Sequence, residues 1–232
     1  MRTLGLIGGV SWESTVPYYS HINRLIKQRL GGLHSARLIL YSVDFYDVER
    51  LMQAGDWDGT GAVLAGAARA LEAAGAQALI ICSNTLHNVA GAVQAAVRIP
   101  LLHLIDATAA EIVQAGYRTV GLLGTRFAME QPFYRERLQG AYGLAVLTPE
   151  PSDRELLHRV ILQELCLGEL RESSRAECRR IMQRLIAQGA EAIILGCTEL
   201  SLLIAPSDAS VPMFDTTAIH ARHAAEWALT GE

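Results

Sequence analysis

Ser83 and Cys197 are two residues with acid–base chemistry that follow similar apolar segments. Ser83 comes after the segment 77–82, and Cys197 stands 114 positions later, after the segment 192–195. A thiol becomes an effective base when its pKa is lowered, and a hydroxyl group donates a proton readily. Two such groups on opposite faces of one carbon suit inversion of configuration, because one removes a proton and the other delivers a proton to the opposite face.

Repeated strand–helix units must position these two residues. Continuous apolar strands that alternate with amphipathic helices are typical of parallel sheets covered by helices on both faces. The sequence therefore predicts an α/β fold. The predicted strands are 4–8, 37–43, 77–82, 101–105, 120–123, 144–147, 192–195 and 212–214, and the stretches between them include helices at 13–30, 60–74, 85–97, 106–115, 152–164, 173–188 and 217–229.

An internal repeat divides the chain into two similar halves. The segments 3–8 and 119–124 read TLGLIG and TVGLLG, and the segments 74–80 and 188–194 read AGAQALI and QGAEAII. We predict one domain from 1–98 with 212–232, and a second from 99–211.

The repeat places Ser83 and Cys197 at equivalent strand ends. Ligands of open α/β sheets bind at the carboxyl ends of the strands, where helix N-termini favour anions. If the two halves face each other about a pseudo-twofold axis, Ser83 and Cys197 flank one ligand. We therefore expect the active site in a cleft between the domains.

The segments around both residues carry recognisable signatures. Residues 82–87 read CSNTLH and residues 195–200 read LGCTEL. They resemble the Cys-Asn-Thr and Gly-Cys-Thr-Glu signatures of the aspartate/glutamate racemase superfamily. Residues 5–15, which read GLIGGVSWEST, resemble the amino-terminal loop of its aspartate racemase branch, and residues 124–125 and 214–216 also resemble that branch.

This resemblance implies two flavodoxin-like halves and racemisation of aspartate or glutamate without a cofactor. Ser83 and Cys197 are then the catalytic pair. Asn84, Thr85 and Thr198 bind the polar groups of the substrate, cap their helices, or do both, and Glu199 either orients and activates Cys197 or complements a helix dipole. The substrate-binding residues that we predict are Val10, Ser11, Met52, Asn84, Thr85, Thr125, Cys166, Thr198 and Glu199.

The sequence departs from the family pattern at two positions. Ser83 stands where most relatives have a catalytic cysteine, and the chain looks closest to a subgroup of bacterial L-aspartate/glutamate racemases with threonine there. Neighbouring residues of a strand point to opposite faces, so Cys82 is expected to face the core. Cys166 stands where aspartate-specific relatives often carry lysine.

Two other functions remain open at this point. Some relatives with a single catalytic cysteine decarboxylate malonates or isomerise maleate. A degenerate relative would bind an amino acid without turnover. The resemblance is compatible with a homodimer, but the sequence does not identify an interface.

Composition excludes several classes of partner. The 232 residues are 50% apolar and 19% charged, with a net charge of −4 and no basic tract, which argues against nucleic-acid binding. The apolar runs are too short for a membrane span. The four cysteines have no CxxC or metal-ligand spacing, and no secretory segment is apparent, so we expect a cytoplasmic protein with reduced thiols and no metal.

Five of the seven histidines are predicted to be solvent-facing. We expect His21, His87 and His158 to lie on helix surfaces. His220 and His223 are three residues apart on the closing helix, and a solvated face is favoured there over a metal site.

Overall fold

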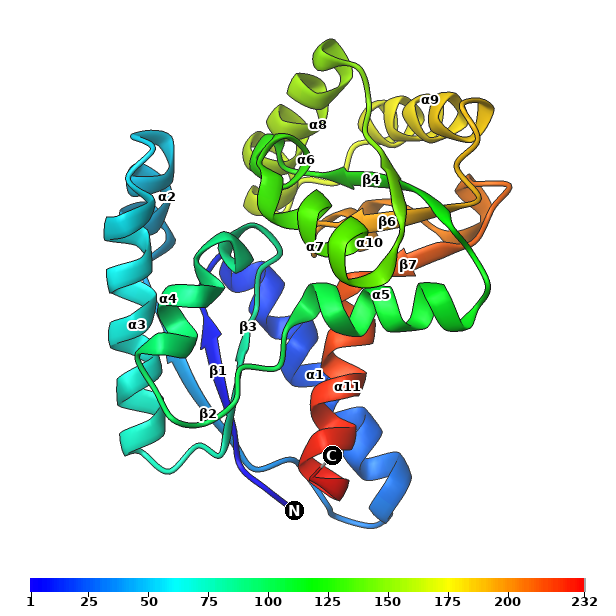
Figure 1. The fold of residues 1–232 in the computed structure, drawn as a ribbon. Helices are drawn as coiled ribbons and strands as arrows, with labels where there is room; N and C mark the ends of the chain where they lie inside the picture. The colour runs from blue at the N-terminus through cyan, green and yellow to red at the C-terminus, as the bar shows by residue number, and fades with distance from the viewer. Residues whose placement is uncertain (232) are drawn as a thin grey trace. The chain divides into compact units, whose positions relative to one another are not determined.

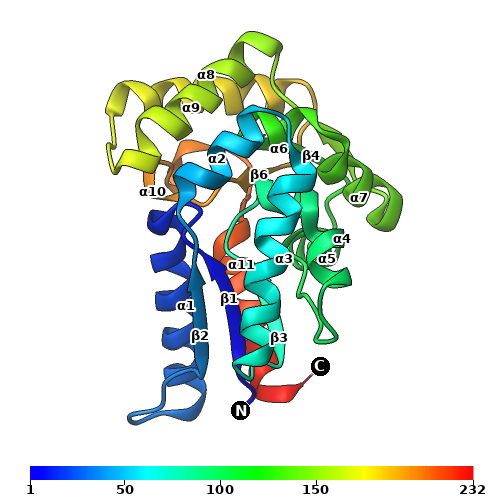
Figure 2. The ribbon, with the colours of Figure 1, turned by 90° about the vertical axis from the view of Figure 1, so that its left-hand side faces the viewer.

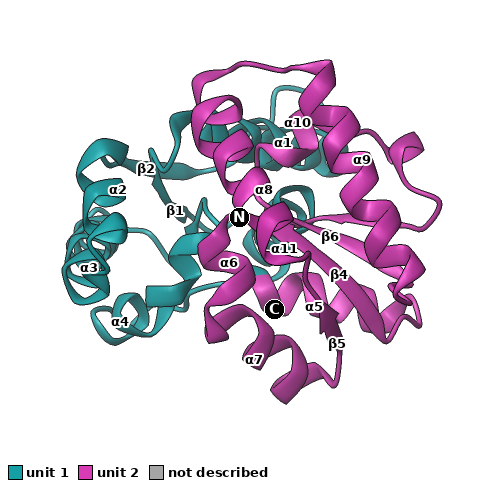
Figure 3. Ribbon diagram, turned by 90° about the horizontal axis from the view of Figure 1, so that it is seen from above, with its two compact units in different colours: residues 1–104, 217–232 teal, residues 105–216 magenta. Residues whose placement is uncertain are grey.

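The computed structural model describes residues 1–231, which form two compact units. The first unit is Met1–Leu104 with the chain from Thr217 onward, and the second is Ile105–Thr216 (Figure 3). Each unit has a parallel sheet with helices on both faces, which confirms the predicted α/β class. Within residues 1–231, no helix combines the length and the apolar character needed to cross a membrane.

The first unit is built on a three-stranded parallel sheet. Its strands are β1 (Leu4–Gly8), β2 (Leu38–Ser42) and β3 (Ala78–Ile81), in the order β2-β1-β3. Leu101 adds a parallel bridge to Leu79 beyond β3. All residues of β1 and β3 are buried, as expected for the central strands of a sheet covered on both faces.

Helices cover both faces of this sheet (Figures 1 and 2). The helices α1 (Trp12–Leu30) and α11 (Thr216–Thr230) lie on one face, and α3 (Trp57–Ala73) and α4 (Ala90–Ala95) lie on the other. The remaining elements are α2 (Phe45–Gln53) and the 3-10 helix η1 (Thr85–Val89), so the predicted helix 85–97 is in fact two short segments.

The core of the first unit lies between the sheet, α1 and α11. Tyr18, Ile22 and Ile26 are fully buried and recur every four residues, so they form one face of α1. They pack in one cluster with Leu4 and Leu6 of β1. The buried residues of α11 in this cluster are mainly small: Ala221, Ala224, Ala225, Trp227 and Ala228.

The second unit has a four-stranded parallel sheet. Its strands are β4 (Thr119–Gly124), β5 (Ala145–Leu147), β6 (Ala192–Gly196) and β7 (Met213–Asp215), in the order β5-β4-β6-β7. In Figure 1, α8 and α9 lie on one face of this sheet and α5 lies on the other. The helical elements are α5 (Leu104–Gln114), α6 (Arg126–Glu130), α7 (Pro132–Tyr142), α8 (Pro151–Gln163), η2 (Leu165–Leu167), α9 (Glu172–Ala187), α10 (Leu200–Leu203) and η3 (Pro206–Asp208).

The two sheets reproduce the repeat found in the sequence. The order β2-β1-β3 corresponds to β5-β4-β6, and the bridge at Leu101 corresponds to β7. The backbone N–H of Leu79 donates to the Pro100 carbonyl at 2.8 Å, and the N–H of Ile193 donates to the Pro212 carbonyl at 2.9 Å. The third strands of the two units, β3 and β6, are therefore equivalent.

Close helix–sheet packing also repeats. A Cβ atom added to Gly5 would lie 2.8 Å from Leu79 of β3 and 3.2 Å from Leu71 of α3. One added to Gly121 would lie 2.7 Å from Ile193 of β6 and 3.0 Å from Leu185 of α9. Any larger residue at either position would force the neighbouring side chain to move. Gly5 and Gly121 thus allow the same close approach of neighbouring side chains in the two units.

The unit boundaries differ from the predicted 98/99 and 211/212. The structure places residues 99–104 with the first unit because Leu101 pairs with Leu79 of β3. It places residues 212–216 with the second unit because β7 pairs with β6. The predicted strand 101–105 is reduced to this one bridge, since α5 already begins at Leu104.

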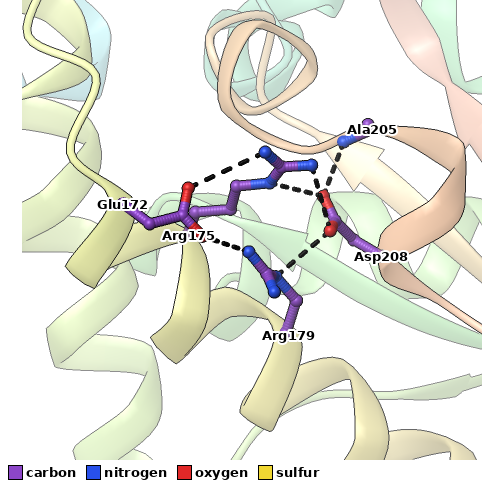
Figure 4. Close-up of polar contacts among 5 residues, drawn as sticks. All are labelled: Glu172, Arg175, Arg179, Ala205 and Asp208. Atoms are coloured by element: carbon purple, nitrogen blue, oxygen red, sulfur yellow. Dashed lines mark hydrogen bonds and ion pairs between the residues drawn. The ribbon is translucent and has the colours of Figure 1, made fainter.

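Asp208 anchors the loop between α10 and β7 to α9 (Figure 4). Its carboxylate accepts hydrogen bonds from Arg175 Nε at 2.8 Å and from the backbone N–H of Ala205 at 2.8 Å, and it forms an ion pair with Arg179. The carboxylate is 5% exposed. The Arg175 guanidinium holds the pKa of Asp208 below its usual value.

We expect Asp208→Asn to lower the midpoint of thermal unfolding by about 3–6 °C at pH 7, because the charge-assisted bonds are lost. Since the folded-state pKa is depressed, this stabilisation is present above the unfolded pKa and is lost as pH falls through the folded pKa. The difference should therefore shrink as the pH falls below the ordinary carboxyl pKa and Asp208 becomes protonated. In contrast, Glu172→Gln should have little effect, because Glu172 binds the same arginines but is 71% exposed. Calorimetry of the three proteins across pH checks both statements, and equal effects of the two substitutions would contradict them.

Candidate functional site

Cys197 and Cys166 contact one buried carboxylate in the second unit. Cys197 follows β6 directly, and its Sγ donates to Oε2 of Glu199 at 2.9 Å. Sγ of Cys166, in η2, donates to Oε1 of the same carboxylate at 3.3 Å. Glu199 is 3% exposed and Cys197 is 7% exposed, so this is a largely dehydrated group of acid–base side chains.

The environment of Cys197 keeps its thiol protonated. Burial raises the pKa of Cys197 well above its ordinary value, and the negative charge of Glu199 raises it further. Near neutral pH the side chain is therefore a neutral thiol that donates to a carboxylate. For a thiol in this state to serve as a base, its proton would first have to move, and the Glu199 carboxylate lies within hydrogen-bond distance.

Two other predicted residues of this unit also follow strand ends. Thr125 comes after β4, the neighbour of β6, and caps α6: its Oγ1 accepts the N–H of Ala128 at 3.2 Å. Thr198 lies between Cys197 and Glu199, and its carbonyl accepts a hydrogen bond from Ser201 Oγ at 2.8 Å. Thr125 and Thr198 are buried.

Ser83 occupies the equivalent strand end in the first unit. It follows β3, and its Oγ accepts the backbone N–H of Leu86 at 3.4 Å, in the turn that leads into η1. Asn84 and Thr85 come next in this turn and are buried. The Ser83 oxygen thus accepts from a backbone donor, and its O–H group can still donate a hydrogen bond.

The remaining predicted residues lie elsewhere in the first unit. Val10 and Ser11 follow β1, which pairs with β3, and Ser11 caps α1. Met52 is a buried residue of α2, an element that the sequence did not predict. Three of the predicted residues, Cys166, Cys197 and Glu199, are joined by hydrogen bonds in the second unit.

The predictions for the remaining cysteine and histidine side chains have different outcomes. Cys82 is fully buried in the core, which confirms its predicted orientation. The predictions for His87, His158 and His220 are wrong, because all three are buried. A lone histidine in a predicted helix carries no periodic signal that would have indicated its burial.

The architecture and these strand-end residues define the class of protein. It is a duplicated α/β protein with a side chain that carries an exchangeable proton, Ser83 or Cys197, after the third strand of each parallel sheet. The model of the Asp/Glu/hydantoin racemase family matches residues 7–224, so the chain belongs to that family. It is therefore an amino-acid racemase, an enzyme of the isomerase class.

Two solved structures and one curated protein are similar to almost the whole chain. A candidate Asp/Glu racemase from Yersinia pestis is 54% identical, with a TM-score of 0.92 over 99% of this chain and 100% of that chain. An aspartate racemase homologue from Pyrococcus horikoshii OT3 is 37% identical, with a TM-score of 0.84 over 99% and 100% of the two chains. The broad specificity amino-acid racemase RacX of Bacillus subtilis is 22% identical over 94% of this chain and 95% of its own length.

Proposed function

We propose that the protein racemises aspartate, glutamate or both without a cofactor, by removing the α-proton on one face and adding a proton on the other. The observation that carries the proposal is the hydrogen bond between the Cys197 thiol and the buried Glu199 carboxylate. It supplies an acid–base pair at the end of β6, and Ser83 supplies a hydroxyl at the equivalent end of β3.

Cys197 serves the enantiomer whose α-proton it faces. As the reaction begins, the thiol proton moves from Sγ to Oε2 of Glu199, across the 2.9 Å hydrogen bond. The thiolate then removes the α-proton, and the electron pair of the broken C–H bond remains on the α-carbon. Donors around the substrate carboxylate stabilise this carbanion, and the exclusion of water strengthens their effect.

Ser83 delivers its hydroxyl proton to the opposite face in this direction and becomes an alkoxide. The alkoxide then takes a proton from solvent and Glu199 releases one, which restores the starting state. In the reverse direction the alkoxide form of Ser83 removes the α-proton. The enantiomers have equal free energies, so the equilibrium constant is one and kcat/KM is equal in the two directions. A serine that is a weak base therefore slows both directions equally. Cys197 can still exchange the α-proton of its own enantiomer without inversion.

The other predicted residues hold the substrate. We propose that Asn84, Thr85, Thr125 and Thr198 bind its α-carboxylate and ammonium group, with Val10, Ser11 and Met52 completing the site. We propose that Cys166, which donates to Glu199, orients this carboxylate and also contacts the substrate.

Proton NMR in deuterium oxide tests the proposed function. Each enantiomer of aspartate and glutamate is incubated with the enzyme, and chiral chromatography measures inversion. We expect α-proton exchange with inversion for at least one of the two amino acids. If none of the four compounds exchanges, the proposed substrate class is wrong, and malonates and maleate become the next substrates to test.

We further propose that the enzyme is a cytoplasmic homodimer. Trp12, Val16 and Tyr19 of α1 are more than half exposed although they are large and apolar, and such side chains are typical of protein interfaces. The four cysteines are free thiols, as the cytoplasm favours. A monomeric mass in analytical ultracentrifugation would contradict the dimer, and recovery of the native protein in a secreted fraction would contradict the location.

A further inference from the structure

His87 contacts the backbone of Ser83, and both nitrogens of its imidazole ring form hydrogen bonds. It is a residue of η1 and is 3% exposed. Its Nδ1 lies 2.7 Å from the backbone carbonyl oxygen of Ser83. Its Nε2 lies 3.2 Å from the backbone nitrogen of Leu104, which donates to it.

These two partners determine the tautomer of His87. A carbonyl oxygen only accepts, so Nδ1 must carry the hydrogen that it donates to Ser83. A backbone N–H only donates, so Nε2 must be unprotonated. His87 is therefore a neutral imidazole with a hydrogen on Nδ1, and its orientation is fixed on both sides.

Neighbouring rings hold His87 in place. The ring of His103 lies 4.6 Å away and that of His220 lies 5.7 Å away, both measured between ring centres. Nε2 of His220 donates to the Leu102 carbonyl at 2.8 Å, and its Nδ1 accepts from the Tyr18 hydroxyl at 2.8 Å. Burial lowers the pKa of His220 to about 3, and the proximity of His87 contributes, so this neighbour is also neutral at pH 7.

We infer that His87 is a positioning residue that holds the Ser83 hydroxyl in its reactive orientation, an inference that rests on the proposed function. The turn after β3 is fixed at two points of Ser83. The Leu86 N–H binds its side-chain oxygen, and the His87 ring binds its carbonyl. Without the Nδ1–H group the peptide between Ser83 and Asn84 can rotate, which displaces the hydroxyl. A displacement of about 1 Å in a reacting group reduces rates by roughly 10²-fold.

Two amide substitutions separate the contact to Ser83 from the contact to Leu104. The Asn amide branches at the carbon that bears Nδ1 in histidine, so His87→Asn can still donate to the Ser83 carbonyl. The Gln amide lies one atom further out, level with Nε2, so His87→Gln can still accept from Leu104 but does not reach Ser83. Both variants keep a polar side chain in the buried position.

The measurement is α-proton exchange in deuterium oxide for each enantiomer, together with racemisation and thermal unfolding. In His87→Gln we expect racemisation to fall by roughly 10²-fold, with exchange lost only for the enantiomer whose α-proton faces Ser83. Exchange of the enantiomer that faces Cys197 should stay within about twofold, since that step uses the hydrogen bond between Cys197 and Glu199 and not the turn after β3. His87→Asn should recover most of the lost exchange.

Other outcomes would overturn the inference in distinguishable ways. Equal loss of exchange for both enantiomers in His87→Gln would assign His87 a merely structural role. Nitrogen NMR of the wild-type ring gives a test that does not depend on any variant, and a hydrogen on Nε2 instead of Nδ1 would contradict the assignment. Failure of the wild-type enzyme to exchange any acidic amino acid would instead overturn the proposed function on which the inference rests.

Discussion

Replacing Cys197 with alanine should lower kcat/KM for racemisation by about 10³-fold in both directions. Positioned acid–base groups typically contribute 10²- to 10⁴-fold, and this substitution removes the thiol that transfers the α-proton. The variant should also lose the exchange without inversion that Cys197 supports alone. The Ser83→Ala variant should behave differently. Its racemisation rate should fall, but α-proton exchange of the enantiomer that faces Cys197 should remain. The measurement is the rate of α-proton exchange and of inversion for each enantiomer.

Cys178→Ala is the matched control for Cys197→Ala. Cys178 is a buried thiol of α9 in the same unit, and burial, aided by nearby carboxylates, raises its pKa to about 12. It is therefore a neutral core residue, and its removal should affect stability more than turnover. A Cys197→Ala variant that retains more than a tenth of the wild-type kcat/KM would exclude Cys197 as the catalytic base.

Glu199→Gln should lower kcat/KM by about 10²-fold while it makes the Cys197 thiol more reactive. Burial and the Glu199 charge both raise the pKa of Cys197, so removing the charge lowers this pKa, although burial still holds it above the ordinary value. A larger thiolate fraction at a given pH means faster alkylation by iodoacetamide. Turnover falls because glutamine cannot accept the thiol proton.

The proposed role of Glu199 can be tested because Glu199→Gln should slow turnover and at the same time speed the alkylation of Cys197. Alkylation of Cys197 is followed across pH by mass spectrometry of its peptide, and its onset should move to lower pH in Glu199→Gln. Glu136→Gln, which neutralises an exposed carboxylate of α7, should change neither quantity. If alkylation and turnover decreased together, Glu199 would be holding the thiol in place and not accepting its proton.

The repeat made much of the fold predictable from the sequence. Residues 3–8 and 119–124 contain β1 and β4, and the matched segments 74–80 and 188–194 lead into β3 and β6. The order β2-β1-β3 in the first sheet therefore corresponds to β5-β4-β6 in the second. Helix α2 was not predicted because it has few buried residues. Val48 and Met52 form one short apolar face in an otherwise charged segment. Local pattern gives little signal for such a helix.

The candidate site was predictable only in part. Ser83 and Cys197 could be placed at strand ends because each follows an apolar strand of the repeat. The contact between Cys166 and Glu199 joins residues 33 positions apart, and nothing in the local sequence specifies the direction of either side chain. The burial of His87 likewise depends on Leu104 and the neighbouring rings, which come from other segments.

The order of the units along the chain has a consequence for synthesis on the ribosome. The second unit is one continuous segment, whereas the first unit needs α11, which emerges after the second unit. Until then, the apolar face of α1 and β1 lacks the alanine-rich helix that covers it in the folded protein. Domains usually fold in order from the N-terminus, but here the second unit should be complete first. Chaperones should therefore bind mainly to residues 1–104, whose apolar face is still uncovered. Protease protection of stalled chains would reveal this order: residues 105–216 should become resistant before residues 1–104.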